Sequence, residues 1–134
     1  MKKFTVVIVQ LFTYTMNLNL KIANFFRKYS ALKGSTGVEL DERLLKVNNV
    51  YFSKNKANAF SNPELTRFLN GNGIKEIHIV GLFTEGCSLH NNFHTTVVKD
   101  AVASSSDKKR LIALNKLRSN KVKVIDSFQL LEML

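Results

Sequence analysis

The sequence lacks most of the features that mark secreted, membrane-spanning or multidomain proteins. It has 134 residues and one cysteine, so it has no internal disulfide bond and no sign of an oxidising compartment. No segment reaches the ~18 apolar residues that a membrane span needs. Thr5, Gln10 and Thr13 interrupt the apolar start, so we expect a buried strand there rather than a signal peptide. These absences predict one cytoplasmic domain over residues 1–134, without a membrane partner.

Acidic residues are scarce, and residues 1–38 contain none, because the first carboxylate of the chain is Glu39. The formal net charge is +10, from 20 Lys and Arg against 10 Asp and Glu. A charge of this size attracts phosphate groups and other anions. The basic residues are nevertheless scattered, and the one basic run, Lys108 to Arg110, is not interleaved with aromatic residues. We therefore expect a solvated basic surface and no nucleic-acid partner.

Strands and helices alternate along the chain, which predicts an α/β fold with a mainly parallel sheet and helices on both of its faces. The expected strands are 3–9, 47–52, 74–80, 95–99 and 121–125. Four helices are expected. The first covers 17–29 and the second begins at Pro63. The third follows Ser104 to Ser106 and has apolar positions 111, 112, 114 and 117, and the fourth runs from a Ser127 cap to Leu134. Functional residues of such sheets follow the carboxyl ends of strands, where Lys54 and Cys87 both lie.

Three interpretations of Cys87 stay open from the residues alone. A helix N-terminus beside a lysine ammonium lowers the pKa of a thiol and makes it a nucleophile, and the SLHNNF that follows has the pattern of such a helix start. Cys87, His90 and His94 share one helical face, as metal ligands do, but a structural zinc site normally has four ligands. A lone cysteine is more often an ordinary buried thiol.

Four motifs appear in the order and spacing of a known family. GSTGVEL at 34–40 is similar to a G-T-x-G-x-E-L segment, and KNKANAF at 54–60 to a K-x-x-x-S-A-F block. GLFTEGCS at 81–88 resembles a G-x-x-T-[DE]-x-C-V loop, and VVKDAVASS at 97–105 the strand that follows it. Together they resemble the isochorismatase-like cysteine hydrolases, which include nicotinamidases, N-carbamoyl amide hydrolases and isochorismatases.

This resemblance implies a three-layer α/β sandwich and an Asp–Lys–Cys catalytic triad. Cys87 would attack the carbonyl carbon of a small amide, and Lys54 would stabilise the charge that develops there. The backbone N–H groups of Phe83 and Cys87 would bind the oxyanion, with a cis peptide bond between Leu82 and Phe83. In nicotinamidases the metal-binding Asp and His residues lie in a segment that this chain lacks, so we expect no metal here, and we expect no cofactor. Members of the family commonly pair, so the resemblance implies a homo-oligomer.

The chain departs from the family pattern in its triad. The aspartate is expected two positions before Gln10, where Ile8 stands. Glu85 is the nearest carboxylate to Cys87 in the sequence, but its position has a different role in the family. General acid–base catalysis contributes ~100- to 10,000-fold to the rate, so its loss would reduce activity severely.

The chain is also shorter than the family pattern around 10–34 and 88–94. Either these segments are deleted or the numbering conceals segments that were left out. Two functions therefore remain. The first is a cysteine hydrolase that acts on a C–N bond of a small amide through Cys87 and Lys54. The alternative is a non-catalytic relative that binds a small ligand or a partner subunit.

Overall fold

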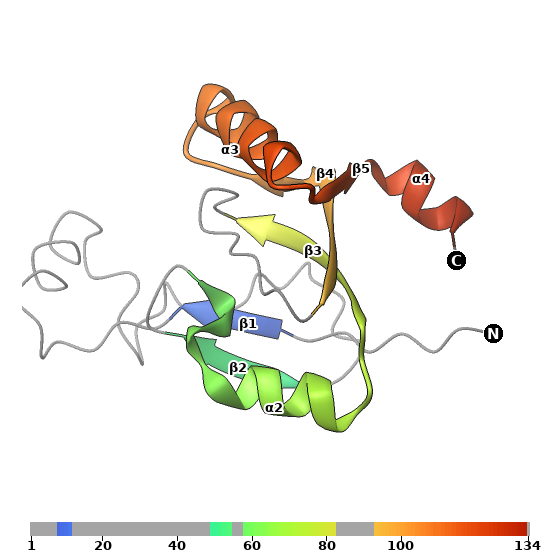
Figure 1. The fold of residues 1–134 in the computed structure, drawn as a ribbon. Coiled ribbons are helices and arrows are strands. Elements are labelled where there is room, and N and C mark those ends of the chain that lie inside the picture. The colour runs from blue at the N-terminus through green and yellow to red at the C-terminus, as the bar shows by residue number, and fades with distance from the viewer. Residues whose placement is uncertain (1–7, 12–48, 55–57, 83–92, 134) are drawn as a thin grey trace, which may run out of the picture. The chain divides into compact units, whose positions relative to one another are not determined.

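A computed structural model of the chain describes residues 8–11, 49–54, 58–82 and 93–133. The chain divides into two compact units, over Lys3–Leu65 and Thr66–Leu134. The first unit contains β1 (Ile8–Leu11), β2 (Tyr51–Lys54) and the 3-10 helix η2 (Ala59–Ser61). The second contains β3 (Glu76–Leu82), β4 (His94–Ala103), α3 (Asp107–Ser119), β5 (Lys123–Ile125) and α4 (Ser127–Glu132) (Figure 1). Helix α2 (Pro63–Gly71) crosses the boundary between them.

In the first unit, β1 and β2 pair in parallel. Ile8 lies opposite Tyr51, and Leu11 lies opposite Lys54 at the carboxyl ends of the two strands. The predicted strands 3–9 and 47–52 both end two residues before the observed ones, which end at Leu11 and Lys54. The prediction followed the apolar runs, whereas the ladder also includes the polar residues Gln10 and Ser53.

Strands β3, β4 and β5 of the second unit form a parallel sheet in that order. Helix α3 connects β4 to β5, as a crossover between parallel neighbours requires. The predicted α/β class, a mainly parallel sheet with flanking helices, is confirmed. Its strands 74–80, 95–99 and 121–125 correspond to β3, β4 and β5, with β4 longer at its carboxyl end than expected.

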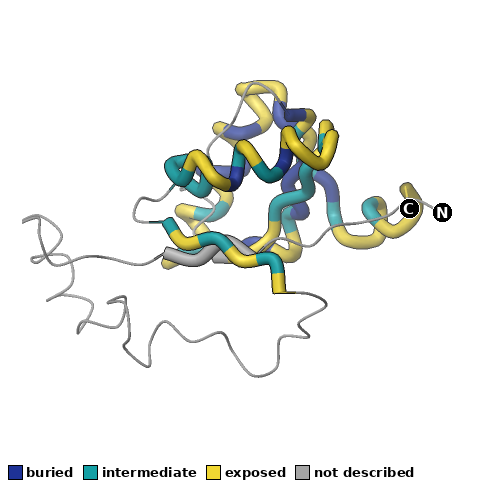
Figure 2. The backbone as a smooth tube through the Cα atoms, turned by 90° about the horizontal axis from the view of Figure 1, so that it is seen from below, coloured by how far each residue is buried: buried dark blue, intermediate teal, exposed yellow. Residues whose placement is uncertain are grey.

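The core of this unit lies between α3 and one face of the sheet, where the buried residues gather (Figure 2). It consists of Val97, Val102, Leu114, Leu117 and Val122, with Ile79 and Val124 packed against them. Of the four apolar positions that predicted this helix, Leu114 and Leu117 face the core, whereas Leu111 and Ile112 are 53% and 58% exposed. Successive helical residues are about 100° apart, so the face that Leu114 and Leu117 define leaves both of them in solvent.

The ends of the helices follow local hydrogen bonding. Pro63 begins α2 as predicted, and Asn62 Oδ1 accepts from the Glu64 N–H at 2.9 Å. Ser106 is the N-cap of α3 and accepts from the Lys109 N–H. The cap predicted at Ser127 is wrong. Asp126 caps α4 in a capping box with Gln129, and the helix ends at Glu132 rather than Leu134.

Strand β4 contains a bulge opposite the end of β3. Ile79 pairs with Val97 and Gly81 with Val102, so five positions along β4 match two along β3. Residues an odd number of positions apart normally lie on opposite faces of a strand, yet Val97 and Val102 share one core. The bulge therefore turns both valines to the same side. No helix in the described residues is long and apolar enough to cross a membrane.

Candidate active site

Lys54 is the last residue of β2 and is half-buried, at the strand end where the sequence predicted it. The Asn62 side-chain amide donates to the carbonyl of Ser53 at 2.8 Å. This bond connects the start of α2 to the residue immediately before Lys54. Within the first unit the carboxyl end of β2 is therefore supported by a side-chain contact as well as by its partner strand.

The KNKANAF motif continues into a tight turn after β2. Asn58 Oδ1 accepts from the Phe60 N–H at 2.8 Å, and the Ser61 hydroxyl donates to the Asn58 carbonyl at 2.7 Å. These bonds form the 3-10 helix η2 directly before Pro63. Part of this motif is thus explained by local structure, because an asparagine at position 58 caps the turn that leads into α2.

Ile8 occupies the position where the family pattern expects the triad aspartate. The register pairs Ile8 with Tyr51, three positions before the Leu11–Lys54 pair, or about 10 Å along the strand. Partial burial raises the pKa of Tyr51 above its ordinary value of 10.0. Neither β1 nor β2 contains an aspartate or a glutamate, so these two strands supply no carboxylate to Lys54.

The segment predicted to carry the nucleophile follows the carboxyl end of β3. Gly81 has φ of +116°, which a residue with a side chain rarely adopts, so glycine is required where β3 leads into this segment. Phe83, Glu85, Cys87 and the expected cis peptide after Leu82 lie outside the described residues.

The metal interpretation of Cys87 loses one of its ligands. His94 is the first residue of β4, rather than part of a helix that begins near Cys87. His78 lies in β3, as expected from the sequence. In the parts of the chain that the structure describes, no group of three His, Cys, Asp or Glu side chains could hold a metal ion.

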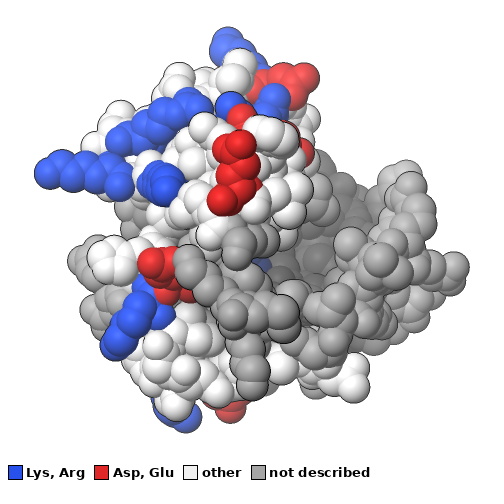
Figure 3. Space-filling view, turned by 90° about the vertical axis from the view of Figure 1, so that its right-hand side faces the viewer, with Lys and Arg blue, Asp and Glu red and all other residues white. Residues whose placement is uncertain are grey.

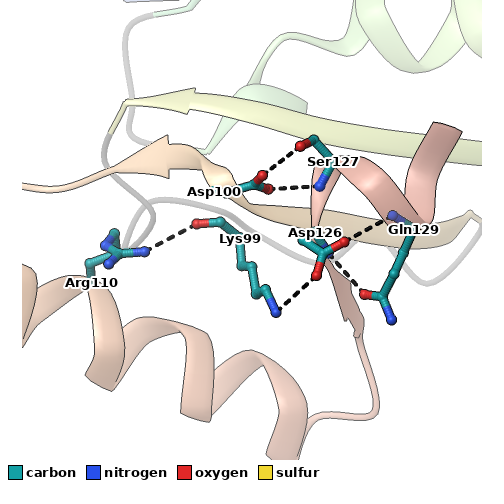
Figure 4. Close-up of polar contacts among 6 residues, drawn as sticks. All are labelled: Lys99, Asp100, Arg110, Asp126, Ser127 and Gln129. Atoms are coloured by element: carbon teal, nitrogen blue, oxygen red, sulfur yellow. Dashed lines mark hydrogen bonds and ion pairs between the residues drawn. The ribbon is translucent and has the colours of Figure 1, made fainter.

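A polar cluster lies at the carboxyl ends of β4 and β5 (Figure 4). Asp100 accepts from the Ser127 N–H at 2.8 Å and from its hydroxyl at 2.5 Å. Lys99 Nζ is 3.3 Å from Asp126 Oδ2, and Arg110 Nη1 donates to the Lys99 carbonyl at 3.1 Å. Two neighbouring residues of the bulge thus contact two neighbouring residues at the start of α4.

Sequence reasoning assigned Asp100 only to the DAVAS motif and did not find its partner. The available signal was an aspartate late in one predicted strand and a serine at a predicted helix start. The Ser127 hydroxyl donates to Asp100. The helix is capped instead by Asp126, the residue before Ser127, whose carboxylate accepts from the Gln129 N–H. The same contact explains why the predicted cap was displaced by one residue.

Both carboxylates of this cluster are stabilised in their charged form. The Ser127 hydroxyl holds the pKa of Asp100 below its ordinary value of 3.8. The Gln129 N–H, with help from Lys99, lowers the pKa of Asp126. A general acid needs a proton near neutral pH and hence a raised pKa. Asp100 and Asp126 therefore lack the raised pKa that a general acid needs, and their contacts connect β4 to the start of α4.

The isochorismatase domain family matches residues 2–129, and the chain belongs to that family. The parallel sheet, the lysine at a strand end and the glycine at the start of the GLFTEGCS segment agree with this assignment. No curated protein matches the chain in sequence.

Solved structures support the same fold. An isochorismatase-like hydrolase from Alkaliphilus metalliredigens has a TM-score of 0.78 and 21% identity, over 93% of this chain and 70% of that one. A nicotinamidase/pyrazinamidase from Bacillus subtilis has a TM-score of 0.74 and 24% identity, over 90% and 74%.

An N-carbamoylsarcosine amidase from Thermoplasma acidophilum has a TM-score of 0.70 and 26% identity, over 90% and 71%. The chain therefore spans about seven-tenths of each of these three relatives.

Proposed function

We propose that the chain is a cysteine hydrolase that cleaves a C–N bond of a small amide, with Cys87 as nucleophile and Lys54 beside it. The proposal rests on membership of the isochorismatase family and on one structural observation above all. Lys54 ends a parallel strand, which is the position where a charged side chain of such a sheet contacts substrate. The similarity to two amide-cleaving enzymes supports the choice of a C–N bond.

In the proposed reaction the Cys87 thiolate attacks the amide carbonyl carbon and forms a C–S bond. The C–N bond then breaks, and the nitrogen leaves as ammonia or an amine after it takes up one proton. Water attacks the resulting thioester, releases the carboxylic acid and regenerates the thiol. The Lys54 ammonium would stabilise the thiolate and the oxyanion, and the N–H groups of Phe83 and Cys87 would donate to that oxyanion.

The proton that Cys87 loses and the proton that the leaving nitrogen gains both need a carrier. Ile8 has no ionisable group, and the described carboxylates nearest to a strand end, Asp100 and Asp126, have lowered pKa values. Glu85 or water would have to serve instead, and we expect a slow enzyme as a result.

The absence of a carboxylate at position 8 favours a second candidate, a non-catalytic relative that binds a small amide-like ligand or a partner subunit. With isoleucine at position 8 and no carboxylate in β1 or β2, the proton transfer of the triad is absent while the rest of the site pattern remains. Binding needs only the pocket and its donors, so it survives this change.

Thiol reactivity separates the two candidates. At pH 6 an ordinary thiol, with a pKa of ~8.5, reacts slowly because less than ~1% is thiolate. We expect rapid alkylation of Cys87 by iodoacetamide at this pH, at least about tenfold slower in Lys54→Ala, since loss of the ammonium raises the thiol pKa.

Lys75→Ala, which removes an exposed lysine from the turn before β3, is the matched control and should react like the unaltered chain. Slow alkylation in every variant would contradict the hydrolase proposal. If the thiol is reactive, the next measurement is the release of ammonia from nicotinamide or N-carbamoylsarcosine. Release by the unaltered chain but not by Cys87→Ala would identify the substrate class.

We also propose that the chain associates with itself. Large apolar side chains are exposed on the second unit, among them Val80, Phe128 and Leu131, at 60%, 69% and 67%. Burial of such side chains in an interface is favourable. Light scattering on the protein as it elutes from a size-exclusion column should give a mass above that of one chain. A monomer at every concentration would contradict this.

A further inference from the structure

One face of the β3–β4–β5 sheet is polar at the amino ends of its strands. Paired residues of parallel strands lie on the same face. The register pairs Glu76 with His94, and it aligns His78, Thr96 and Lys123 in one row. These five side chains therefore share the face opposite the one that α3 covers.

Such a face is unusual for a parallel sheet. Parallel strands are normally covered on both sides and are apolar on both. Here the α3 side follows that rule with Ile79, Val97 and Val124, whereas the other side is apolar only toward the carboxyl ends, at Val98 and Ile125. Core packing thus explains the apolar residues at the carboxyl ends of this face, but it does not explain the polar residues at the amino ends.

A pocket of about 370 Å³ lies over the polar half of this face. Besides the five residues of the two rows, its lining includes Phe93, Thr95, Asn120, Lys121, Val122 and Met133. The volume suits a small organic molecule or an inorganic ion with its water. All of these described lining residues belong to the second unit.

The charge of the lining favours an anion. Lys121 and Lys123 bring two ammonium groups, against the single carboxylate of Glu76. Within the described part of the chain neither lysine is in an ion pair. The Lys123 ammonium donates to the Met133 sulfur at 3.4 Å, and a thioether is a weak acceptor. Both ammonium groups therefore retain hydrogen-bond donors for a ligand.

His78 is one of the lining residues. Its Nδ1 atom is buried and has no hydrogen-bond partner among the described residues. A buried polar atom without a partner is costly, and native structures contain few of them. Because this atom is closed to solvent, a ligand in the pocket would contact the rest of the imidazole, and the case for an anion rests on the two lysines.

We propose that this pocket is a binding site for a small doubly charged oxyanion, the chemistry that phosphate esters and dicarboxylates share. Lys121 and Lys123 supply the charge, and His78, His94 and Asn120 supply further donors. The site lies at the amino ends of the strands. Strand β3 runs about 20 Å from Glu76 to Leu82, and in the sequence Cys87 follows its opposite end. The inference therefore does not depend on the hydrolase proposal.

The test is a titration of the full chain with sodium phosphate, and in a second arm with sodium succinate, at constant ionic strength. Side-chain NMR signals of His78 and His94 and the amide signals of Lys121 and Lys123 report on the pocket. We expect saturable shifts confined to these residues. Lys121→Gln/Lys123→Gln should weaken binding about tenfold or more, since each charge-assisted hydrogen bond contributes roughly tenfold.

Lys108→Gln/Lys109→Gln removes the same charge from the exposed start of α3 and should bind like the unaltered chain. Saturation by phosphate alone identifies a phosphate ligand, and saturation by both identifies a dianion site. Shifts that never saturate, that spread over the basic surface, or that weaken equally in the control variant would overturn the proposal. If the double variant is unfolded by circular dichroism, the titration of the unaltered chain decides the question by itself.

Discussion

The two ends of the β3–β4–β5 sheet use similar residue types in opposite ways. At the carboxyl ends, Asp100 bonds to Ser127 and Lys99 to Asp126, so that each charged group has a partner (Figure 4). At the amino ends, neither the Lys121 ammonium nor the buried Nδ1 atom of His78 has a partner among the described residues.

The polar residues of this sheet therefore fall into two groups, according to whether their hydrogen-bonding and charged groups have partners within the protein. Satisfied groups determine where α4 begins, and unsatisfied ones remain for a ligand. Position along the chain does not distinguish them, and neither does charge. On the face that Figure 3 shows, the described lysine and arginine side chains lie at several separate places, with carboxylates among them.

The largest effect should come from the core that supports both ends. Leu114 is 2% exposed and packs in the cluster between α3 and the sheet. Leu114→Ala should lower the free energy of unfolding by ~2–5 kcal/mol through lost burial and the cavity left behind, and should weaken both ends together. Urea unfolding measures this loss. Leu111→Ala, at a 53% exposed position of the same helix, is the control, expected within ~0.5 kcal/mol of the unaltered chain.

A smaller loss should follow removal of the carboxylate that Ser127 contacts. Asp100→Ala should lower the melting temperature because α4 loses two hydrogen bonds to β4. Ser127→Ala should add little once Asp100 is gone, since the two residues act as a pair. Asp107→Ala removes an acid that is 90% exposed and serves as the control. Equal and additive losses in all three variants would show that the contact does not connect the two elements.

The effect of Asp100 also depends on pH with a definite sign. Its pKa and that of Asp126 are lower in the folded chain than their ordinary value of 3.8. Their contribution is therefore complete above this value and is lost as pH falls through the lowered folded pKa values. The melting temperature should fall below about pH 4, and less steeply in Asp100→Ala than in the unaltered chain.

The smallest effect on stability is expected at the amino end. His78→Leu removes the imidazole with the unpaired buried nitrogen, so stability should stay unchanged or rise by up to ~1 kcal/mol. The same substitution should weaken phosphate binding. A destabilisation as large as that of Asp100→Ala would erase the contrast between the two ends.

Much of the fold could be predicted because local signals agree with it. Pro63 after Asn62 marks the start of α2, and Ser106 before an acidic first turn marks that of α3. The bulge in β4 could not be predicted, because it depends on the register with β3. The Asp126 cap was missed for a similar reason, since it follows from a contact between residues 27 positions apart.

Only those residues of the candidate site that lie in the sequence motifs could be predicted. Lys54 stands at a strand end as the KNKANAF motif indicated, while the roles of Cys87 and Phe83 stay predictions. The polar row of His78, Thr96 and Lys123 had no signal in the sequence. It forms only when three strands, far apart in the chain, come into one register.

The bulge of β4 has a consequence for how this strand tolerates changes in length. Between Val97 and Val102, β4 has three residues more than its ladder with β3 would need, and Lys99 and Asp100 are among the residues of this stretch. On the other side of β4, Val97 and Val98 pair with Val124 and Ile125, so Lys99 and Asp100 continue that register beside Asp126 and Ser127. A deletion in this stretch would therefore change the contacts to the last helix even where the strand kept its pairing with β5.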